Sequence, residues 1–133
     1  MKTIDYQVED GVAILTIDVK ERTMNVLTPD LIKDLRSALD EVKSDDAVKG
    51  AVITSAKDSF VAGADLMQMV KAYDDGRSAA DKYADSRSFQ SLLRDIETSG
   101  KPFAAAVNGT ALGGGLEICL ACHYRVAADN PKS

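Results

Sequence analysis

Short apolar runs alternate with helical patterns along the whole chain, and this alternation limits the possible folds more than any other feature. Apolar residues between Tyr6 and Ile17 flank the pair Asp10-Gly11 and predict an N-terminal β-hairpin with a tight turn. The elements expected after it are a helix that begins at Thr28-Pro29, a strand at 50–54, a helix at 79–98, a strand at 103–107, a helix at 112–122 and a strand at 124–127. Strands that alternate with helices predict an α/β fold whose crossovers wind in one direction.

Local signals support the two longer helices. Thr28 is a typical N-cap, and Pro29 follows at the first helical position, where its missing N–H costs nothing. Gly100 and Pro102 end the second helix in the expected order. In the first helix, apolar residues recur at helical spacing and predict a face that packs on a sheet: Leu31, Ile32, Leu35, Ala38, Leu39 and Val42.

Composition narrows the class of protein and the kind of partner. The 133 residues are 45% hydrophobic and 28% charged, which fits one globular unit. A formal net charge of −5 at pH 7, with no basic run, argues against nucleic acid as a partner. No apolar stretch is long enough for a secretory signal or a membrane span, so we expect a cytoplasmic protein. Cys119 and Cys122 are expected to be reduced thiols.

Two stretches rich in small residues carry the chemistry. Residues 61–65 read Val-Ala-Gly-Ala-Asp after one expected strand, and residues 108–117 read Asn-Gly-Thr-Ala-Leu-Gly-Gly-Gly-Leu-Glu after another. Small residues let a peptide N–H approach a ligand, and two such groups aimed at one carbonyl oxygen form an oxyanion hole. A tight strand-to-helix turn would explain either stretch alone. The two stretches together predict chemistry through an enolate or a similar oxyanion.

Together with Met24-Asn25-Val26-Leu27, these stretches resemble the crotonase superfamily of enoyl-coenzyme A hydratases and isomerases. Within that family, residues 117–127 are similar to the hydratase domain at the N-terminus of multifunctional fatty-acid β-oxidation enzymes. The resemblance implies a crotonase-like superhelix of ββα units, of which residues 1–133 would form the N-terminal part. The second glutamate of the hydratase pattern follows the next strand, so we expect its position beyond Ser133.

The resemblance also implies roles for individual residues. The amides of Ala64 and Gly114 would hold the thioester oxygen of an acyl-CoA, and Glu117 would act as general base or acid. We expect the Glu117 carboxylate to be partly desolvated near the oxyanion site, which would raise its pKa. Asp65 would cap the helix that follows it. The residues expected to line the substrate site are Met24, Val26, Leu27, Ala62, Gly63, Asp65, Leu66 and Gly113.

The activity implied is the addition of water to trans-2-enoyl-CoA in fatty-acid β-oxidation, with acyl-CoA as the substrate and no cofactor. Δ3-Δ2 enoyl-CoA isomerisation is an alternative because one carboxylate is enough to move a proton. A non-catalytic CoA-binding fragment is a second alternative. The resemblance further implies a homo-oligomer or a subunit of a β-oxidation complex. Lys20 and Arg22 are candidates for contacts with the CoA phosphates.

Other motifs point to chemistry less strongly. Residues 119–123 match the C-x-x-C-H pattern of covalent haem attachment, but no export signal accompanies them. His123 is the only histidine, so two cysteines and one histidine leave a zinc site short of a fourth protein ligand, and we expect no metal. Without a nucleophile-elbow serine, the same histidine disfavours a Ser-His-Asp hydrolase. Residues 109–115 lack the Lys-Ser/Thr of a Walker loop and the third glycine of a dinucleotide fingerprint.

Overall fold

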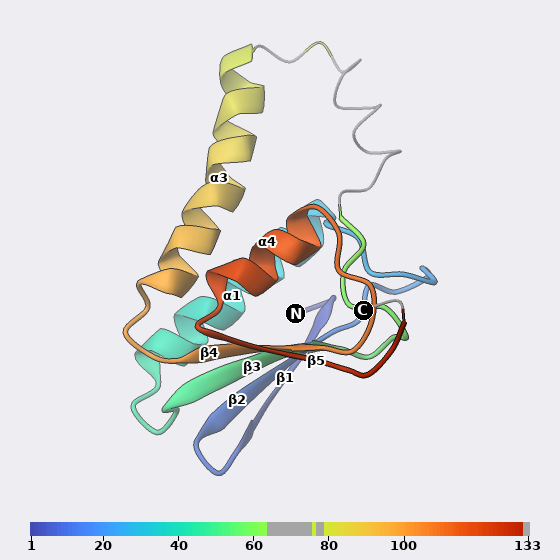
Figure 1. Cartoon of the computed structure of the whole chain (residues 1–133). Coiled ribbons are helices and arrows are strands. Elements are labelled where there is room, and N and C mark those ends of the chain that lie inside the picture. The colour runs from blue at the N-terminus through green and yellow to red at the C-terminus, as the bar shows by residue number, and fades with distance from the viewer. Residues whose placement is uncertain (64–75, 77–78, 132–133) are drawn as a thin grey trace.

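The structure of the protein is a computed structural model that describes residues 1–63, 76 and 79–131 (Figure 1). In this part of the chain the elements are β1 (Ile4–Glu9), β2 (Val12–Ile17), α1 (Pro29–Ser44), β3 (Gly50–Ser55), α3 (Ala79–Glu97), β4 (Phe103–Val107), α4 (Gly114–Ala121) and β5 (Tyr124–Ala127). The alternation of strands and helices expected from the sequence is confirmed, and the fold class is α/β.

The described strands form one sheet in the order β1-β2-β3-β4-β5. β1 is antiparallel to β2, while β2, β3, β4 and β5 are parallel to one another. α1, α3 and α4 stand between consecutive parallel strands and lie over one face of the sheet (Figure 1). Each connection adds the next strand on the same side, so the sheet grows in one direction, as expected. The carboxyl ends of β3 and β4 therefore open at the same edge of the sheet.

The N-terminal hairpin turns at the predicted pair. Asp10 has a φ of 50° and Gly11 a φ of 80°, and a two-residue type I′ turn requires positive φ at both central positions. Glu9 pairs with Val12 directly beside the turn, which sets the register of the whole hairpin. The alternate residues of β2 that point to the helices are buried: Ala13, Leu15 and Ile17.

α1 covers the sheet with the face that its apolar spacing predicted. The Thr28 hydroxyl accepts a hydrogen bond from the Leu31 N–H (3.1 Å), which confirms the N-cap. At the other end, Lys101 Nζ donates to the carbonyls of Val42 (2.6 Å) and Asp45 (2.8 Å), so a cation also satisfies the last carbonyls of the helix. The apolar residues of α1 that lie in the core are Leu31, Leu35, Ala38, Leu39 and Val42.

α4 is shorter than the helix expected at 112–122. Leu112 donates its N–H to the carbonyl of Val61 (3.1 Å) and so belongs to a loop pairing instead of a helix. Gly113 follows with a φ of 52° and a ψ of −121°, a conformation that glycine adopts more easily than other residues. The helix therefore begins at Gly114, because a contact with a distant loop overrides the apolar pattern.

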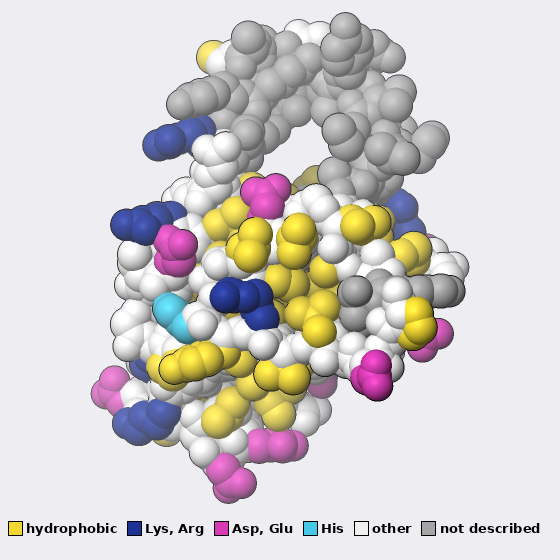
Figure 2. Space-filling view, viewed as in Figure 1, with side chains coloured by type: hydrophobic (Ala, Val, Ile, Leu, Met, Phe, Trp, Pro, Cys, Tyr) yellow, Lys and Arg dark blue, Asp and Glu magenta, His cyan; other side chains and the backbone are white. Residues whose placement is uncertain are grey.

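One side of α4 is not covered by the described residues. Leu112, Leu116 and Leu120 are exposed at helical spacing, and Tyr124 and Val126 of β5 are exposed as well. Figure 2, in the same view as Figure 1, shows hydrophobic side chains gathered on this face. Within the described residues, no helix combines the length and the apolar character that a membrane span requires.

Candidate active site

The loops that follow β3 and β4 lie side by side, although they are far apart in sequence. Phe60 N–H donates to the carbonyl of Thr110 (2.9 Å), and Leu112 N–H donates to the carbonyl of Val61 (3.1 Å). Val61 and Ala111 form an isolated parallel bridge between these two bonds. The two small-residue stretches are thus joined into one short ladder at the carboxyl ends of the strands.

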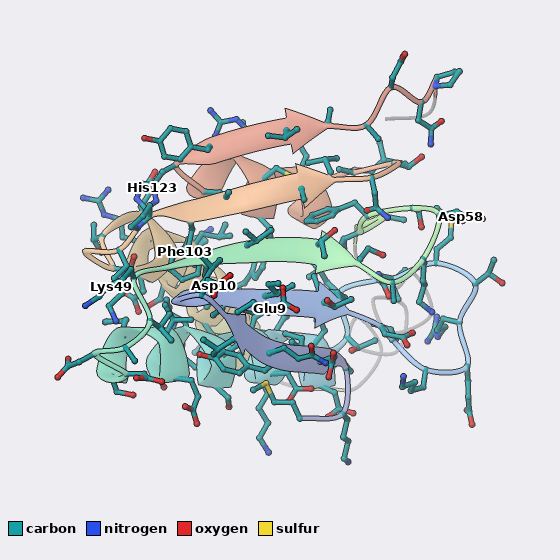
Figure 3. The ribbon with its side chains drawn as sticks, turned by 90° about the horizontal axis from the view of Figure 1, so that it is seen from below. Glu9, Asp10, Lys49, Asp58, Phe103 and His123 are labelled. Carbon is teal, nitrogen blue, oxygen red and sulfur yellow. The ribbon has the colours of Figure 1, made fainter. Side chains whose placement is uncertain are left out.

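Two glycines make this close approach possible. A Cβ on Gly109 would collide with the carbonyl oxygen of Asp58, and a Cβ on Gly115 would collide with the carbonyl oxygen of Val61. Both obstacles are backbone atoms, which cannot rotate away as a side chain can. Figure 3 shows Asp58 at the opposite end of the sheet from His123. At these two positions glycine is therefore required by the packing of one loop on the other.

The predicted segment 24–27 lies on the other side of the loop after β3. Ala62 N–H donates to the carbonyl of Asn25 (2.8 Å), and Leu27 N–H donates to the carbonyl of Gly63 (2.7 Å). The backbone from Phe60 to Gly63 is therefore held between two neighbouring segments. The structure brings three of the sequence motifs together at one place.

Asn25 is a buried polar residue to which the sequence analysis gave no role of its own. Its side chain is 0% exposed, and its Oδ1 accepts a hydrogen bond from the Val19 N–H (2.9 Å). Its Nδ2 donates to the Ser55 hydroxyl (2.8 Å) and to the Phe60 carbonyl (3.0 Å). The signal in the sequence was an amide side chain inside an otherwise apolar segment, Met-Asn-Val-Leu.

Asn108 and Lys57 tie further parts of the same loops. Asn108 Nδ2 donates to the carbonyl of Lys57 (2.7 Å) and lies 3.3 Å from the carbonyl of Ser55. Lys57 Nζ in turn donates to the carbonyl of Val19 (2.6 Å) and to the carbonyl of Arg22. Neither residue was expected from the sequence to have a function of its own. Asn108 therefore ties the segment after β4 to the segment after β3, and Lys57 ties the segment after β3 to the segment after β2.

Gly114, one of the two predicted oxyanion donors, is the first residue of α4. Among the described residues, its N–H has no hydrogen-bond acceptor, as is usual for the first amides of a helix. A Cβ on Gly113 would lie 3.8 Å from the Gly63 Cα, so the two stretches touch beside this amide. A Cβ on Gly114 would meet the side chain of Leu27, with Phe89 at 3.5 Å. The structure thus brings the predicted Leu27, Gly63, Gly113 and Gly114 together.

The remaining predicted residues differ in where they lie. Met24 is 39% exposed, whereas Val26 and Ala62 are half-buried. Ala64, the other predicted donor, lies outside the described residues, as do two predicted substrate-site residues, Asp65 and Leu66. Their assignments stay predictions.

Glu117 lies in the first turn of α4, one turn after Gly114. The expectation of a partly desolvated carboxylate is not met in the described part of the chain, because the Glu117 side chain is exposed. It lines a cavity of about 360 Å³ between α3 and α4, together with Leu93, Arg94 and Glu97. Glu117 lies on the side of α4 opposite to residues that are buried in the core, such as Cys119.

Lys20 and Arg22, the candidates for phosphate contacts, line a cavity of about 760 Å³ with Lys2 and the start of α1 at Thr28. Lys20 forms an exposed ion pair with Asp18 (2.7 Å). Among the described residues, this cavity is the place where the two candidate cations lie near each other.

The C-x-x-C-H pattern has a structural explanation. The Phe103 N–H donates to His123 Nδ1 (2.9 Å), so Nε2 carries the ring proton and donates to the Glu97 carbonyl (3.0 Å). Burial raises the pKa of the Cys119 thiol, and it raises the pKa of Cys122 to about 12. The histidine therefore joins α3 to β4, and both cysteines are buried thiols. No group of three potential metal ligands occurs within the described residues.

A comparison with protein families identifies the family of this chain. Residues 7–133 match the family model described as enoyl-CoA hydratase/isomerase. The chain belongs to the enoyl-CoA hydratase/isomerase family. The resemblance to crotonases inferred from the motifs is thereby confirmed.

Individual members of the enoyl-CoA hydratase/isomerase family are similar over nearly the whole chain. The fatty acid oxidation complex subunit alpha of Shewanella halifaxensis is 43% identical over 126 residues, which are 94% of this chain and 17% of that protein. A crystal structure of an enoyl-CoA hydratase/isomerase from Xanthobacter autotrophicus Py2 has 29% identity and a TM-score of 0.83, and covers 94% of this chain and 45% of its own. Enoyl-CoA hydratase from Bacillus anthracis has 28% identity and a TM-score of 0.83, over 96% and 48% of the two chains. The chain thus spans less than half of each of these proteins and shares their crotonase-like fold.

Proposed function

We propose that this protein acts on acyl-CoA thioesters and adds water to trans-2-enoyl-CoA, as an enoyl-CoA hydratase of fatty-acid β-oxidation. The observation that carries the proposal is the Gly114 amide, which has no acceptor among the described residues and lies beside Gly63 at the start of α4. Membership of the enoyl-CoA hydratase/isomerase family makes a thioester oxygen the natural acceptor. The α-subunit relatives support a place in fatty-acid oxidation.

In the proposed hydration, the oxygen of water forms a bond to C3 of the enoyl group while one of its O–H bonds breaks and a base takes the proton, and the π electrons of C2–C3 move toward the thioester oxygen. The resulting enolate takes up a proton at C2, which yields 3-hydroxyacyl-CoA. Negative charge thus develops on the thioester oxygen, where donors fixed in advance stabilise it without reorganising. We assign the amides of Ala64 and Gly114 as these donors, each worth about 3–4 kcal/mol. The positive end of the α4 dipole adds to them.

Glu117 is the proposed proton-transfer group. It follows Gly114 by three residues, so the two residues lie one turn apart on the same side of α4. In the hydratase it would activate the water or deliver the proton to C2. We keep the other predicted residues as the walls of the acyl-CoA site: Met24, Val26, Leu27, Ala62, Gly63, Asp65, Leu66 and Gly113.

Isomerisation of 3-enoyl-CoA to 2-enoyl-CoA is the second candidate. The observation that favours it is that Glu117 is the carboxylate which the described residues place in the first turn after Gly114. A single base can remove a proton from C2, leave the charge on the same thioester oxygen, and return the proton at C4. The two reactions share the oxyanion donors and differ in the need for a second carboxylate.

The relatives support a wider setting for the protein. Because the similar α-subunits are named as parts of a bacterial fatty acid oxidation complex, we propose that the protein works within such a complex in the cytoplasm. The acyl-CoA substrate would pass between the activities of that complex, and no resident cofactor is needed for either proposed reaction.

The test compares Glu117→Gln with Glu97→Gln in the full-length protein. Both side chains line the same cavity between α3 and α4, but Glu97 lies on α3 and pairs with Arg94 (2.7 Å). Turnover is measured with trans-2-enoyl-CoA and with 3-enoyl-CoA as substrates. For the substrate that the wild-type protein turns over, we expect Glu117→Gln to lower kcat about 10²- to 10⁴-fold. Glu97→Gln should leave kcat unchanged. Equal turnover of the two variants would remove Glu117 from the mechanism.

A further inference from the structure

Asn25 contacts the loop after β3 at both ends of a three-residue segment. Its side-chain Nδ2 donates to the carbonyl of Phe60 (3.0 Å), and its own carbonyl accepts the N–H of Ala62 (2.8 Å). On the opposite side, the Val61 carbonyl between them accepts from Leu112 N–H (3.1 Å). This segment is therefore fixed in direction as well as in position.

The same contacts reach the start of α4. Leu27, two residues after Asn25, donates its N–H to the carbonyl of Gly63 (2.7 Å). Gly63 lies beside Gly113, since a Cβ on Gly113 would be 3.8 Å from the Gly63 Cα, and the Val61 carbonyl accepts the Leu112 N–H. The position of residues 60–63 therefore fixes the start of α4, which carries the proposed donor amide of Gly114.

Burial of the Asn25 side chain costs free energy unless its hydrogen bonds to water are replaced. A carboxamide with 0% exposure must replace every hydrogen bond to water by one within the protein. Here Val19 N–H, Ser55 Oγ and the Phe60 carbonyl supply these partners. An apolar residue of similar size would fill the space but leave the Val19 amide and the Phe60 carbonyl unpaired. The donors and acceptor of the Asn25 side chain thus match the hydrogen-bonding groups that surround it.

We propose that Asn25 is a positioning residue for the oxyanion site, which holds the Gly114 donor amide in place through the backbone of residues 60–63 and the hydrogen bond from Leu112 N–H to the Val61 carbonyl. The inference rests on the proposed function. Asn25 touches no reacting atom in this scheme, and its effect on the reaction passes through the loop. A misplaced donor weakens the bond that strengthens in the transition state, so the loss appears in kcat more than in KM.

The test is Asn25→Ala in the full-length protein, with Lys101→Met as the matched control. Lys101 donates hydrogen bonds to Val42 and Asp45 at the far end of α1, so its loss also removes internal hydrogen bonds but leaves residues 60–63 untouched. We expect Asn25→Ala to lower kcat about 10- to 100-fold, with KM changed less than about threefold, because a displacement of about 1 Å costs up to about 100-fold. Lys101→Met should keep both constants.

A second measurement follows the loop directly. Amide hydrogen exchange of Ala62 and Leu27 should become faster in Asn25→Ala than in Lys101→Met, since both amides donate within the segment that Asn25 holds. If Asn25→Ala does not fold, Ser55→Ala removes an acceptor of the Asn25 side chain and should lower kcat about 3- to 10-fold by the same route.

The outcomes separate the inference from the function on which it rests. A wild-type protein that turns over neither thioester overturns the proposed function, and the positioning role with it. An active wild type whose folded Asn25→Ala or Ser55→Ala variant keeps the kcat of the control overturns the positioning role alone. A fall in kcat at constant KM, together with faster exchange at Ala62, supports it.

Discussion

Gly115→Ala tests the contact that joins the two loops of the site. Gly115 is buried in the first turn of α4, and an added Cβ would collide with the carbonyl oxygen of Val61 and lie 2.8 Å from the Val61 Cβ. Val61 cannot retreat, because it is 0% exposed and its carbonyl accepts the N–H of Leu112. The substitution therefore forces either the helix or the loop out of place.

The magnitude follows from two opposed terms. Forcing a methyl group into a packed interior costs about 1–3 kcal/mol, and obstruction by backbone places this case at the upper end, about 3 kcal/mol. Alanine in place of glycine in a helix returns at most about 1 kcal/mol. The expected net loss in the free energy of unfolding is about 2 kcal/mol. For a chain of this length, each kcal/mol shifts Tm by about 4 °C, so Tm should fall by about 8 °C.

Gly114→Ala is the control, since it makes the same chemical change one residue earlier. Its Cβ would meet the end of the Leu27 side chain, which can rotate, so we expect the stability to change by less than about 1 kcal/mol. Urea unfolding followed by circular dichroism gives both values from the transition midpoints at a constant m-value. Equal stability of the two variants would refute the argument that loop packing requires glycine at position 115.

Two further predictions concern buried titratable groups. Burial raises the pKa of Asp34, but hydrogen bonds from Thr3 and Lys2 outweigh it and hold the pKa below its ordinary 3.8. The stabilisation by the Asp34 carboxylate is complete above pH 3.8 and is lost as pH falls through the lowered pKa. Asp34→Asn should therefore lower the free energy of unfolding by about 1–3 kcal/mol at pH 7 and by less in acid. Urea unfolding at each pH measures this difference. Burial raises the pKa of Cys122 to about 12 and also raises that of Cys119, so we expect iodoacetamide at pH 8 to label neither thiol until the protein is unfolded. The stability of the protein should fall as pH rises above 9. Rapid labelling of the native protein would contradict the first of these expectations.

Much of the fold could be predicted because its signals are local. The Asp10-Gly11 turn, the Thr28 cap and the apolar spacing of α1 each act within a few residues, and the structure confirms all three. The start of α4 could not be predicted in this way. Leu112 fits a helical pattern, yet its N–H pairs with Val61 from a loop about fifty residues away, and a competing hydrogen bond of that kind leaves no trace in the local sequence.

The same difference between local signals and distant contacts applies to the candidate site. The resemblance to crotonases pointed to Gly114 and Glu117, but the exposure of Glu117 depends on which elements pack around α4. Asn25 stood within a recognised motif, and nothing in its neighbours indicated that it would contact Val19, Ser55 and Phe60 at once. Ser55 and Phe60 are distant from Asn25 along the chain, so these contacts become visible only when the loops are in place.

The order of strands and helices and the turn at Asp10-Gly11 were properties of the amino-acid sequence itself. Backbone preferences and apolar periodicity act over a few residues, so they are readable in any segment of the chain. The tertiary structure alone decided that residues 60–63 lie between Asn25 and Leu112, and that the Gly114 amide is left without an acceptor in the described residues beside Gly63. Burial and hydrogen bonding between distant segments arise only from packing, and here packing builds the site.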